Sequence, residues 1–318
     1  MNRREFITFA GSVALTPFAA RAQEAYRIYR LGVLVPATRE SIEPFFDELR
    51  IGGFTEGKNL VVTGRYSVRA EQIAESVAEL MKTAPEVILS GPETYLRIMQ
   101  PVTGSIPLDS MSEDLVGEGF AASLAKPGGN VTGVSLLSPE LDGKRLEILV
   151  EAVPGLRRVG ALAHAIVTKP HLEQQRELAR ALGVELSVFP FAKATEIVPA
   201  LDEMKTHGVE AINFLATPQQ IVNRGLILDH MSKIGLPAMY QWPETADLGG
   251  LIGYGPPFVT MYRQRARQVA KLLRGAKPAE MPVEQPANFQ LVVNLKTAKA
   301  IGLEIPAGFV LRADRVIE

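Results

Sequence analysis

The sequence predicts an α/β protein built from two doubly wound lobes with parallel, Rossmann-like sheets joined by a hinge. Three observations predict this fold. Short apolar runs alternate with amphipathic helical segments, the same alternation returns in the second half, and 318 residues are enough for two cores. Strands separated by helices at this pitch are expected to run parallel, with helices on both faces of each sheet.

In the first half, apolar runs predict strands at 30–36, 59–63 and 86–90, and helical spacing predicts helices at 41–51 and 70–83. The second half has the same pattern. Its predicted strands are 158–164, 184–189 and 210–215, and its predicted helices are 171–182 and 195–206. Long helices are also expected at 139–152 and 259–274.

The two halves share short motifs. The pattern Arg-x-Gly-x-Leu occurs at 30–34 and at 158–162, and Met-Lys-Thr occurs at 81–83 and at 204–206. The sequence therefore predicts a first lobe of residues 23–137 plus about 256–284, and a second of 138–255 plus about 285–318. The glycine-rich segments 130–135 and 249–257 are candidate crossovers between the lobes, and surface turns are the alternative.

The first 22 residues indicate where the protein works. Arg3 and Arg4 are followed by a short apolar run that ends at Ala20, and Ala20-Arg21-Ala22 has the small-x-small pattern of a cleavage site. This is typical of a twin-arginine signal peptide, cleaved near Ala22, and it predicts export to the periplasm. The run is too short for a membrane span, so no membrane insertion is expected.

Composition excludes several classes of function. The chain has 34 basic and 35 acidic residues, which argues against nucleic acid as a partner. It has no Cys, so no disulfide, lipoprotein anchor or thiolate metal site is possible. The four His residues have no metal-ligand spacing, and the chain has no Gly-x-Ser-x-Gly motif. Residues 52–58 match the start of a phosphate loop, but Asn59 stands where Ser or Thr is required.

These absences favour binding without chemistry. We expect no catalytic residue, no metal and no cofactor, and a monomer that binds a small molecule.

Ligands of doubly wound sheets bind beyond the carboxyl ends of the strands, where helix N-termini offer free N–H groups. Polar residues after the predicted strands are therefore candidates, although N-capping would also explain each Ser or Thr. The candidate ligand-binding residues are Thr38, Ser41, Ser90, Gly91, Glu93, Thr94, Ser110, Ser112, His164, Thr217, Tyr240 and Trp242. Arg39, Asp109, Gln241 and Glu244 lie at the same strand ends.

Trp242 is the only Trp of the chain, and it is expected either to stack on the ligand or to pack between the lobes. Glu93, Glu113 and Asp114 add negative charge that suits a ligand amino group, and acids in a first helical turn are the alternative.

Short segments along nearly the whole chain carry a resemblance to a known family. They are Arg3–Ile7, Pro127–Ser135, Lys144–Leu149, Tyr240–Trp242, Gly249–Leu251, Gln285–Pro286, Leu295–Ala300 and Arg312–Asp314. In these segments the sequence resembles the ABC-transporter substrate-binding proteins typified by the tryptophan- and tyrosine-binding members. The resemblance implies a two-lobed, type I periplasmic-binding-protein fold that closes on its ligand and delivers it to an ABC permease in the inner membrane.

The chain departs from the family pattern in three loops where ligand should bind. These loops are Ser90–Thr94, Asp114–Gly117 and the segment from His164 to Val167. Ligand identity therefore does not follow from the resemblance, and an amino acid or an aromatic carboxylate is expected. Two alternatives stay open: an exported enzyme with Glu93 or His164 as general base, and a ligand-sensing module for a signalling receptor.

Overall fold

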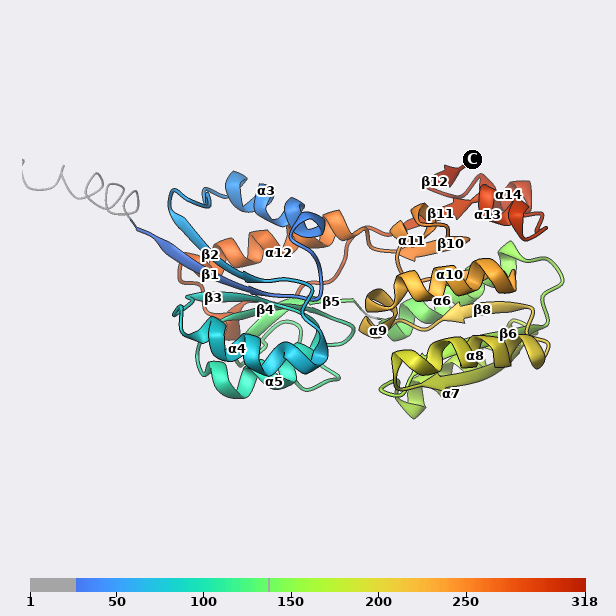
Figure 1. Cartoon of the computed structure of the whole chain (residues 1–318), viewed down its shortest axis with the longest axis horizontal. Helices are drawn as coiled ribbons and strands as arrows, with labels where there is room; N and C mark the ends of the chain where they lie inside the picture. The colour runs from blue at the N-terminus through green and yellow to red at the C-terminus, as the bar shows by residue number, and fades with distance from the viewer. Residues whose placement is uncertain (1–26, 137) are drawn as a thin grey trace, which may run out of the picture.

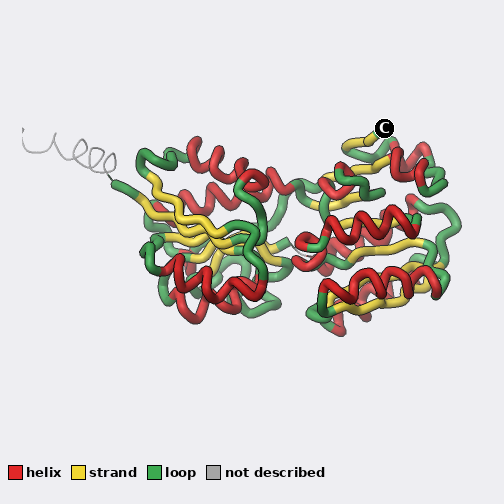
Figure 2. Tube along the Cα trace, viewed as in Figure 1, coloured by secondary structure: helices red, strands yellow, loops and turns green. Residues whose placement is uncertain are grey.

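The computed structural model describes residues 27–136 and 138–318. The predicted signal peptide, 1–22, lies outside the described residues. Two α/β lobes lie side by side along the long axis of the molecule, each with its own sheet and its own covering helices (Figures 1 and 2). The predicted fold class is confirmed.

The first lobe has a five-stranded, fully parallel sheet in the order β2-β1-β3-β4-β5. Its strands are β1 (Tyr29–Leu34), β2 (Leu60–Arg65), β3 (Val87–Ser90), β4 (Leu108–Ser112) and β5 (Val131–Ser135). Its helices are α3 (Glu43–Ile51), α4 (Ile73–Met81), α5 (Glu93–Thr103) and α12 (Phe258–Leu273), with short 3-10 turns η1 (Glu40–Ile42), η2 (Ala70–Gln72) and η3 (Pro278–Glu280).

The second lobe has a seven-stranded sheet in the order β12-β11-β10-β9-β8-β6-β7. Its strands are β6 (Arg158–His164), β7 (Glu185–Phe191), β8 (Ala211–Phe214), β9 (Ala238–Tyr240), β10 (Ile252–Gly255), β11 (Gln290–Asn294) and β12 (Arg315–Ile317). Its helices are α6 (Ser138–Ala152), α7 (Lys169–Ala181), α8 (Ala194–Thr206), α9 (Pro218–Val222), α10 (Arg224–Ile234), α11 (Glu244–Asp247), α13 (Leu295–Ala300) and α14 (Ala307–Val310).

One strand pair of the second sheet differs from the parallel expectation: β10 and β11 are antiparallel. The path of the chain explains this. After β10 the chain leaves for the first lobe, forms α12, and returns to the second lobe from the side on which it left. The strand that follows must then run away from the hinge, opposite to β10.

In both lobes, successive side chains of a strand are buried on opposite faces of the sheet. Within β3, Val87 and Leu89 belong to the core beneath α3 and α12, whereas Ile88 belongs to the core beneath α4 and α5. Successive side chains of a strand point to opposite faces, so a strand with helices on both sides is apolar throughout. This is why the predicted apolar runs appear as strands, with ends shifted by a few residues.

The repeated motifs occupy equivalent places in the two lobes. A Cβ atom at Gly32 of β1 would lie 3.1 Å from Leu80, and one at Gly160 of β6 would lie 3.0 Å from Met204. In each lobe a glycine on the first strand thus allows close approach of the helix that precedes the lobe's third strand in the sequence, α4 before β3 and α8 before β8. The threonine that ends each Met-Lys-Thr segment donates its hydroxyl to the carbonyl three residues earlier, at 2.7 and 2.8 Å.

The glycine-rich segments expected to cross between the lobes form β5 and β10. Both are hydrogen-bonded within a sheet, and the chain passes between the lobes just after each, and again between η3 and β11. Residue Glu284 pairs beside β5 before this last passage, through Glu284 N to Gly133 O at 2.8 Å and Ser135 N to Glu284 O at 2.9 Å. No helix among the described residues has the length and apolar character needed to cross a membrane.

Candidate functional site

The largest cavity described lies between the lobes and has a volume of about 690 Å³. From the first lobe, it is lined by residues that follow β1, β3 and β4 and by the start of α12. From the second lobe, it is lined by residues that follow β8 and β9. The carboxyl ends of strands from both sheets therefore face the same space, as the doubly wound topology requires.

Four of the candidate ligand-binding residues line this cleft: Thr38, Ser41, Gly91 and Trp242. The first two form a turn in which Ser41 N donates to Thr38 Oγ1 at 3.2 Å and Ser41 Oγ donates to Thr38 O at 2.9 Å. The turn explains why the chain needs small hydroxyl residues at the start of η1. It also brings both hydroxyls to the cleft wall.

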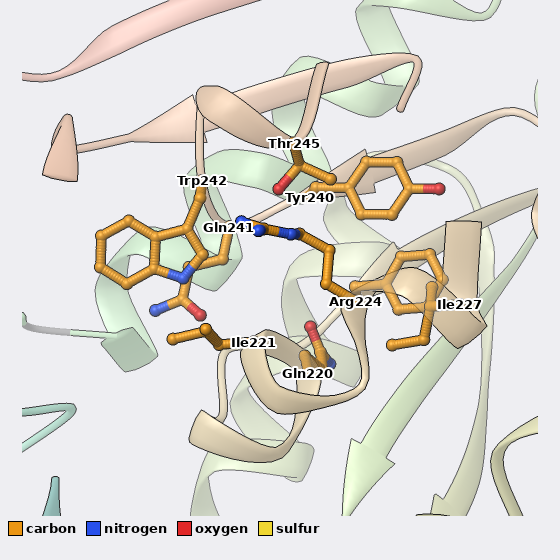
Figure 3. A pocket seen from close by; sticks show the side chains of 9 residues that line it. Gln220, Ile221, Arg224, Ile227, Tyr240, Gln241, Trp242 and Thr245 are labelled. Atoms are coloured by element: carbon orange, nitrogen blue, oxygen red, sulfur yellow. The ribbon is translucent and has the colours of Figure 1, made fainter. Parts of the chain in front are cut away.

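Two further candidates lie next to the cleft in the second lobe. Thr217 is the buried N-cap residue of α9. Tyr240 stacks on Phe214 with 4.8 Å between ring centroids and lines a small side chamber of about 20 Å³ (Figure 3). Trp242, Ile221 and Arg224 line both the chamber and the cleft, so the two spaces adjoin.

The other candidates are held away from the cleft lining. Asp109, Ser110 and Ser112 were expected after a strand, but they lie within β4 and are fully buried. Ser110 Oγ donates to Gly91 O at 2.7 Å, and Ser112 Oγ donates to Glu93 Oε2 at 2.9 Å. The expectation was wrong about their position because a polar run inside a buried strand has the same local pattern as a loop.

Ser90, Thr94 and His164 also lie outside the described cleft lining. The Ser90 hydroxyl faces the sulfur of Met99 at 3.4 Å, and Thr94 lies half-buried in α5. His164 ends β6 with its Nε2 3.2 Å from Ala192 O. Glu93 and His164, the two residues considered as general bases, are buried within their own lobes. This burial lowers the pKa of His164 and raises that of Glu93.

The segment from Gln241 to Glu244 joins the two lobes. Gln241 Nε2 donates to both carboxylate oxygens of Glu113, at 3.0 and 3.2 Å. The indole of Trp242 stacks on Phe258 of α12, with centroids 4.1 Å apart and planes 16° from parallel. Glu244 Oε1 accepts the backbone N–H of Phe258 at 2.7 Å. The loop after β9 thus contacts the first lobe three times within four residues.

The cleft wall of the first lobe contains a buried cation that is already neutralised. Arg265 of α12 donates through Nε to Asp109 Oδ1 at 2.7 Å and through Nη2 to the carbonyls of Ser90 and Asp109. Burial raises the pKa of Asp109 to about 6, and the positive charge of Arg265 opposes that rise. This pair ties α12, which is remote in sequence, to the ends of β3 and β4.

Arg224, the second arginine that lines the cleft, is not neutralised in the way that Arg265 is. Its side chain is half-buried and points from the start of α10 toward the segment that carries Gln241, Trp242 and Thr245 (Figure 3). Within the described residues no hydrogen bond or ion pair holds its guanidinium. Its charge acts on Glu244 of α11, whose pKa burial raises and Arg224 lowers. Sequence reasoning missed Arg224 because a short helix, α9, separates it from the end of β8.

Several buried polar atoms in the segments that follow β8 and β9 have no hydrogen-bond partner among the described residues. They are Thr217 Oγ1, Gln241 Oε1, Trp242 Nε1 and Glu244 Oε2. Buried polar groups are nearly always paired, and each unpaired one costs roughly 1–3 kcal/mol. Trp242 and Glu244 line the cleft and Gln241 lines the side chamber, so these three residues leave open donors and acceptors beside the space that a polar ligand would occupy. No cluster of acids or His suited to a metal ion occurs in the described part of the chain.

Comparison with known proteins decides the family. The family described as ABC transporter substrate binding protein matches residues 32–317. The chain belongs to this family. It is similar to a tyrosine-binding protein of Clostridioides difficile, with 20% identity over 275 residues, 85% of this chain and 78% of the relative.

Two solved structures show the same fold as this substrate-binding protein. One is an ABC domain from Streptococcus pneumoniae in complex with L-Trp, with a TM-score of 0.81 and 21% identity, covering 91% of this chain and all of the other. The second is the ligand-free, open form of a substrate binding protein with adhesive properties from Clostridium difficile, with a TM-score of 0.67 and 17% identity, covering 92% and 99% of the two chains. The expected family and the type I fold are confirmed.

Proposed function

We propose that this substrate-binding protein captures a small organic solute, an amino acid or an aromatic carboxylate, by closing its lobes on it. The observation that carries the proposal is the inter-lobe cleft. Its volume of about 690 Å³ falls in the range of small-molecule sites. Its lining combines apolar and aromatic side chains with a few polar groups, as such sites do, and similar proteins are named for tyrosine or solved with L-Trp.

Closure follows from the way the lobes are connected. Three thin passages join the lobes, and each lobe has its own buried cores. The buried cluster between the lobes is small, formed by Val134, Leu136, Trp242 and Met261, so this connection favours rotation of the lobes as bodies. A ligand that contacts both walls binds the closed form better, and this difference in affinity supplies the free energy of closure. The solute leaves unaltered, since the proposed role is binding and not catalysis.

We further propose that the protein is exported to the periplasm, with cleavage near Ala22, and hands its solute to an ABC permease in the inner membrane as a monomer. The twin arginines at Arg3 and Arg4 and the family support this proposal. Replacing both arginines by lysine is expected to leave the protein in the cytoplasm, as fractionation with mass measurement of the N-terminus would show.

Mass spectrometry of small molecules released from freshly purified, denatured protein tests the binding role directly. We expect a stoichiometric organic solute, and we expect X-ray scattering to give a smaller radius of gyration when that solute is returned to the emptied protein. Absence of any solute, together with scattering that no member of an amino acid and aromatic acid panel changes, would refute the proposal.

A further inference from the structure

Charge pairing leaves one cation of the cleft lining without a partner. Among the described residues that line the cleft, the basic ones are Arg224 and Arg265. Arg265 is paired with Asp109 at 2.7 Å, whereas no hydrogen bond or ion pair holds Arg224. An arginine fork recognises a carboxylate through two parallel hydrogen bonds, and it is worth most where water is partly excluded. Arg224 is half-buried and faces such a space.

An acceptor stands beside this cation. Glu244 lines the same cleft, and its Oε1 is fixed by the 2.7 Å bond from Phe258 N. Its second oxygen, Oε2, is buried and has no partner among the described residues. The charge of Arg224 acts on Glu244, but Glu244 Oε2 has no hydrogen-bond partner among the described residues, so each residue can take a different group of one ligand.

A cation and an anion in the lining of one cleft suit one kind of molecule. The carboxylate and the ammonium of an α-amino acid are separated by a single carbon atom, so the groups that bind them must be neighbours of opposite charge. Trp242 and Ile221 line the same cleft, near Arg224 (Figure 3), and offer apolar surface for the rest of the ligand. Trp242 Nε1, an unpaired donor, adds a second donor for the carboxylate.

We infer, on the basis of the proposed function, that Arg224 and Glu244 are the specificity pair of the cleft: Arg224 binds the carboxylate and Glu244 binds the ammonium of an α-amino acid with an apolar side chain. The pair selects α-amino acids over aromatic carboxylates, because a ligand without an ammonium would leave Glu244 Oε2 buried and unpaired.

Calorimetric titration with matched probes tests this assignment. The amino acids are L-tryptophan, L-tyrosine and L-leucine. The amines that lack the carboxylate are tryptamine, tyramine and isoamylamine. The acids that lack the ammonium are indole-3-propionate, 3-(4-hydroxyphenyl)propionate and 4-methylpentanoate. The wild-type protein is expected to bind at least one amino acid, and to bind its amine and its acid at least tenfold more weakly.

Two variants separate the roles. Arg224→Gln is expected to weaken the amino acid by about 10- to 100-fold while leaving the amine unchanged, as loss of a charged hydrogen-bond partner would. Glu244→Gln is expected to weaken the amino acid by a similar factor while leaving the acid unchanged. Arg263→Gln, an exposed arginine of α12, is the matched control and should bind like the wild type. Thermal unfolding checks that each variant is folded.

Three results would overturn the inference: no amino acid of the panel binds, the acid binds as tightly as its amino acid, or the Arg224 and Glu244 variants bind all probes like the wild type. The proposed function fails separately. A solute recovered by mass spectrometry would preserve it even if this pair did not hold the ligand.

Discussion

At the scale of single residues, the cleft depends on a few polar side chains whose neighbours leave them incompletely paired. Arg265 and Asp109 neutralise each other inside the first lobe, and Gln241 and Glu113 bond across the lobes. Glu244 is bonded through only one of its two oxygens. Burial raises the pKa of this carboxylate, so it loses its charge at a higher pH than an exposed glutamate does.

The first prediction concerns this response. Burial and the negative charge of Asp247 raise the pKa of Glu244 above its usual 4.5, while Arg224 and the N–H of Phe258 lower it, and burial is the largest effect. The ammonium of an amino acid needs the ionised carboxylate. Affinity for L-tryptophan should therefore be full above the raised pKa and fall as pH drops through it, by up to about tenfold per pH unit.

Calorimetry between pH 4 and 8 measures this dependence. Glu244→Gln should flatten the profile, and Glu177→Gln, an exposed acid of α7, should not change its shape. A wild-type profile as flat as that of Glu244→Gln would contradict the prediction.

At the scale of elements, the edge of the first sheet depends on a close approach of two strands. Gly133 of β5 pairs with Ser110 of β4 and has φ of +137°, where side chains are strained. A Cβ atom built there would lie 1.8 Å from the carbonyl oxygen of Ser110. Because the obstacle is backbone, no side-chain rotation can relieve it.

We therefore expect Gly133→Ala to lower the free energy of unfolding by at least about 2 kcal/mol, through strain and displacement of β5. Gly225→Ala is the matched control. Gly225 lies in the first turn of α10 with no atom within 4 Å of an added Cβ, so alanine there should stabilise by about 0.5–1 kcal/mol. Urea unfolding compares the two, and equal effects would show that the close approach does not matter.

At the scale of the whole molecule, the aromatic contact between Trp242 and Phe258 holds one lobe against the other. Trp242 is only 4% exposed, and its stacking partner belongs to α12 of the first lobe. The structure thus gives Trp242 a lobe-packing role, and stacking on the ligand stays a prediction. A residue that lines the cleft and also joins the lobes can report on closure.

Phe258→Leu is expected to loosen this contact, so that the ligand-free protein has a larger radius of gyration by X-ray scattering. Emission of Trp242, the only Trp, should shift to the red because its ring meets water. Phe189→Leu removes a buried aromatic ring far from the cleft and should change neither signal. Unchanged scattering and emission in Phe258→Leu would show that the lobes are held together by other contacts.

The location of the site could be predicted from the sequence, but the side chains that line it could be predicted only in part. The rule that ligands bind beyond strand ends led to Thr38, Ser41, Gly91 and Trp242, which line the cleft. The same rule selected residues whose hydroxyls turn inward. Which way a hydroxyl after a strand points depends on the helix packed against it, and periodicity carries no information about that helix.

The sequence by itself determined the alternation of strands and helices, the division into two similar halves and the family, because each depends on spacing or motifs within short stretches of chain. Only the tertiary structure decided that Arg265 of α12 neutralises Asp109 of β4, which lies 156 positions away in the sequence. It also decided that Arg224 and Glu244, on separate helices, face one cavity. Such pairings depend on how distant segments pack, and distant packing leaves no periodic signal in the sequence.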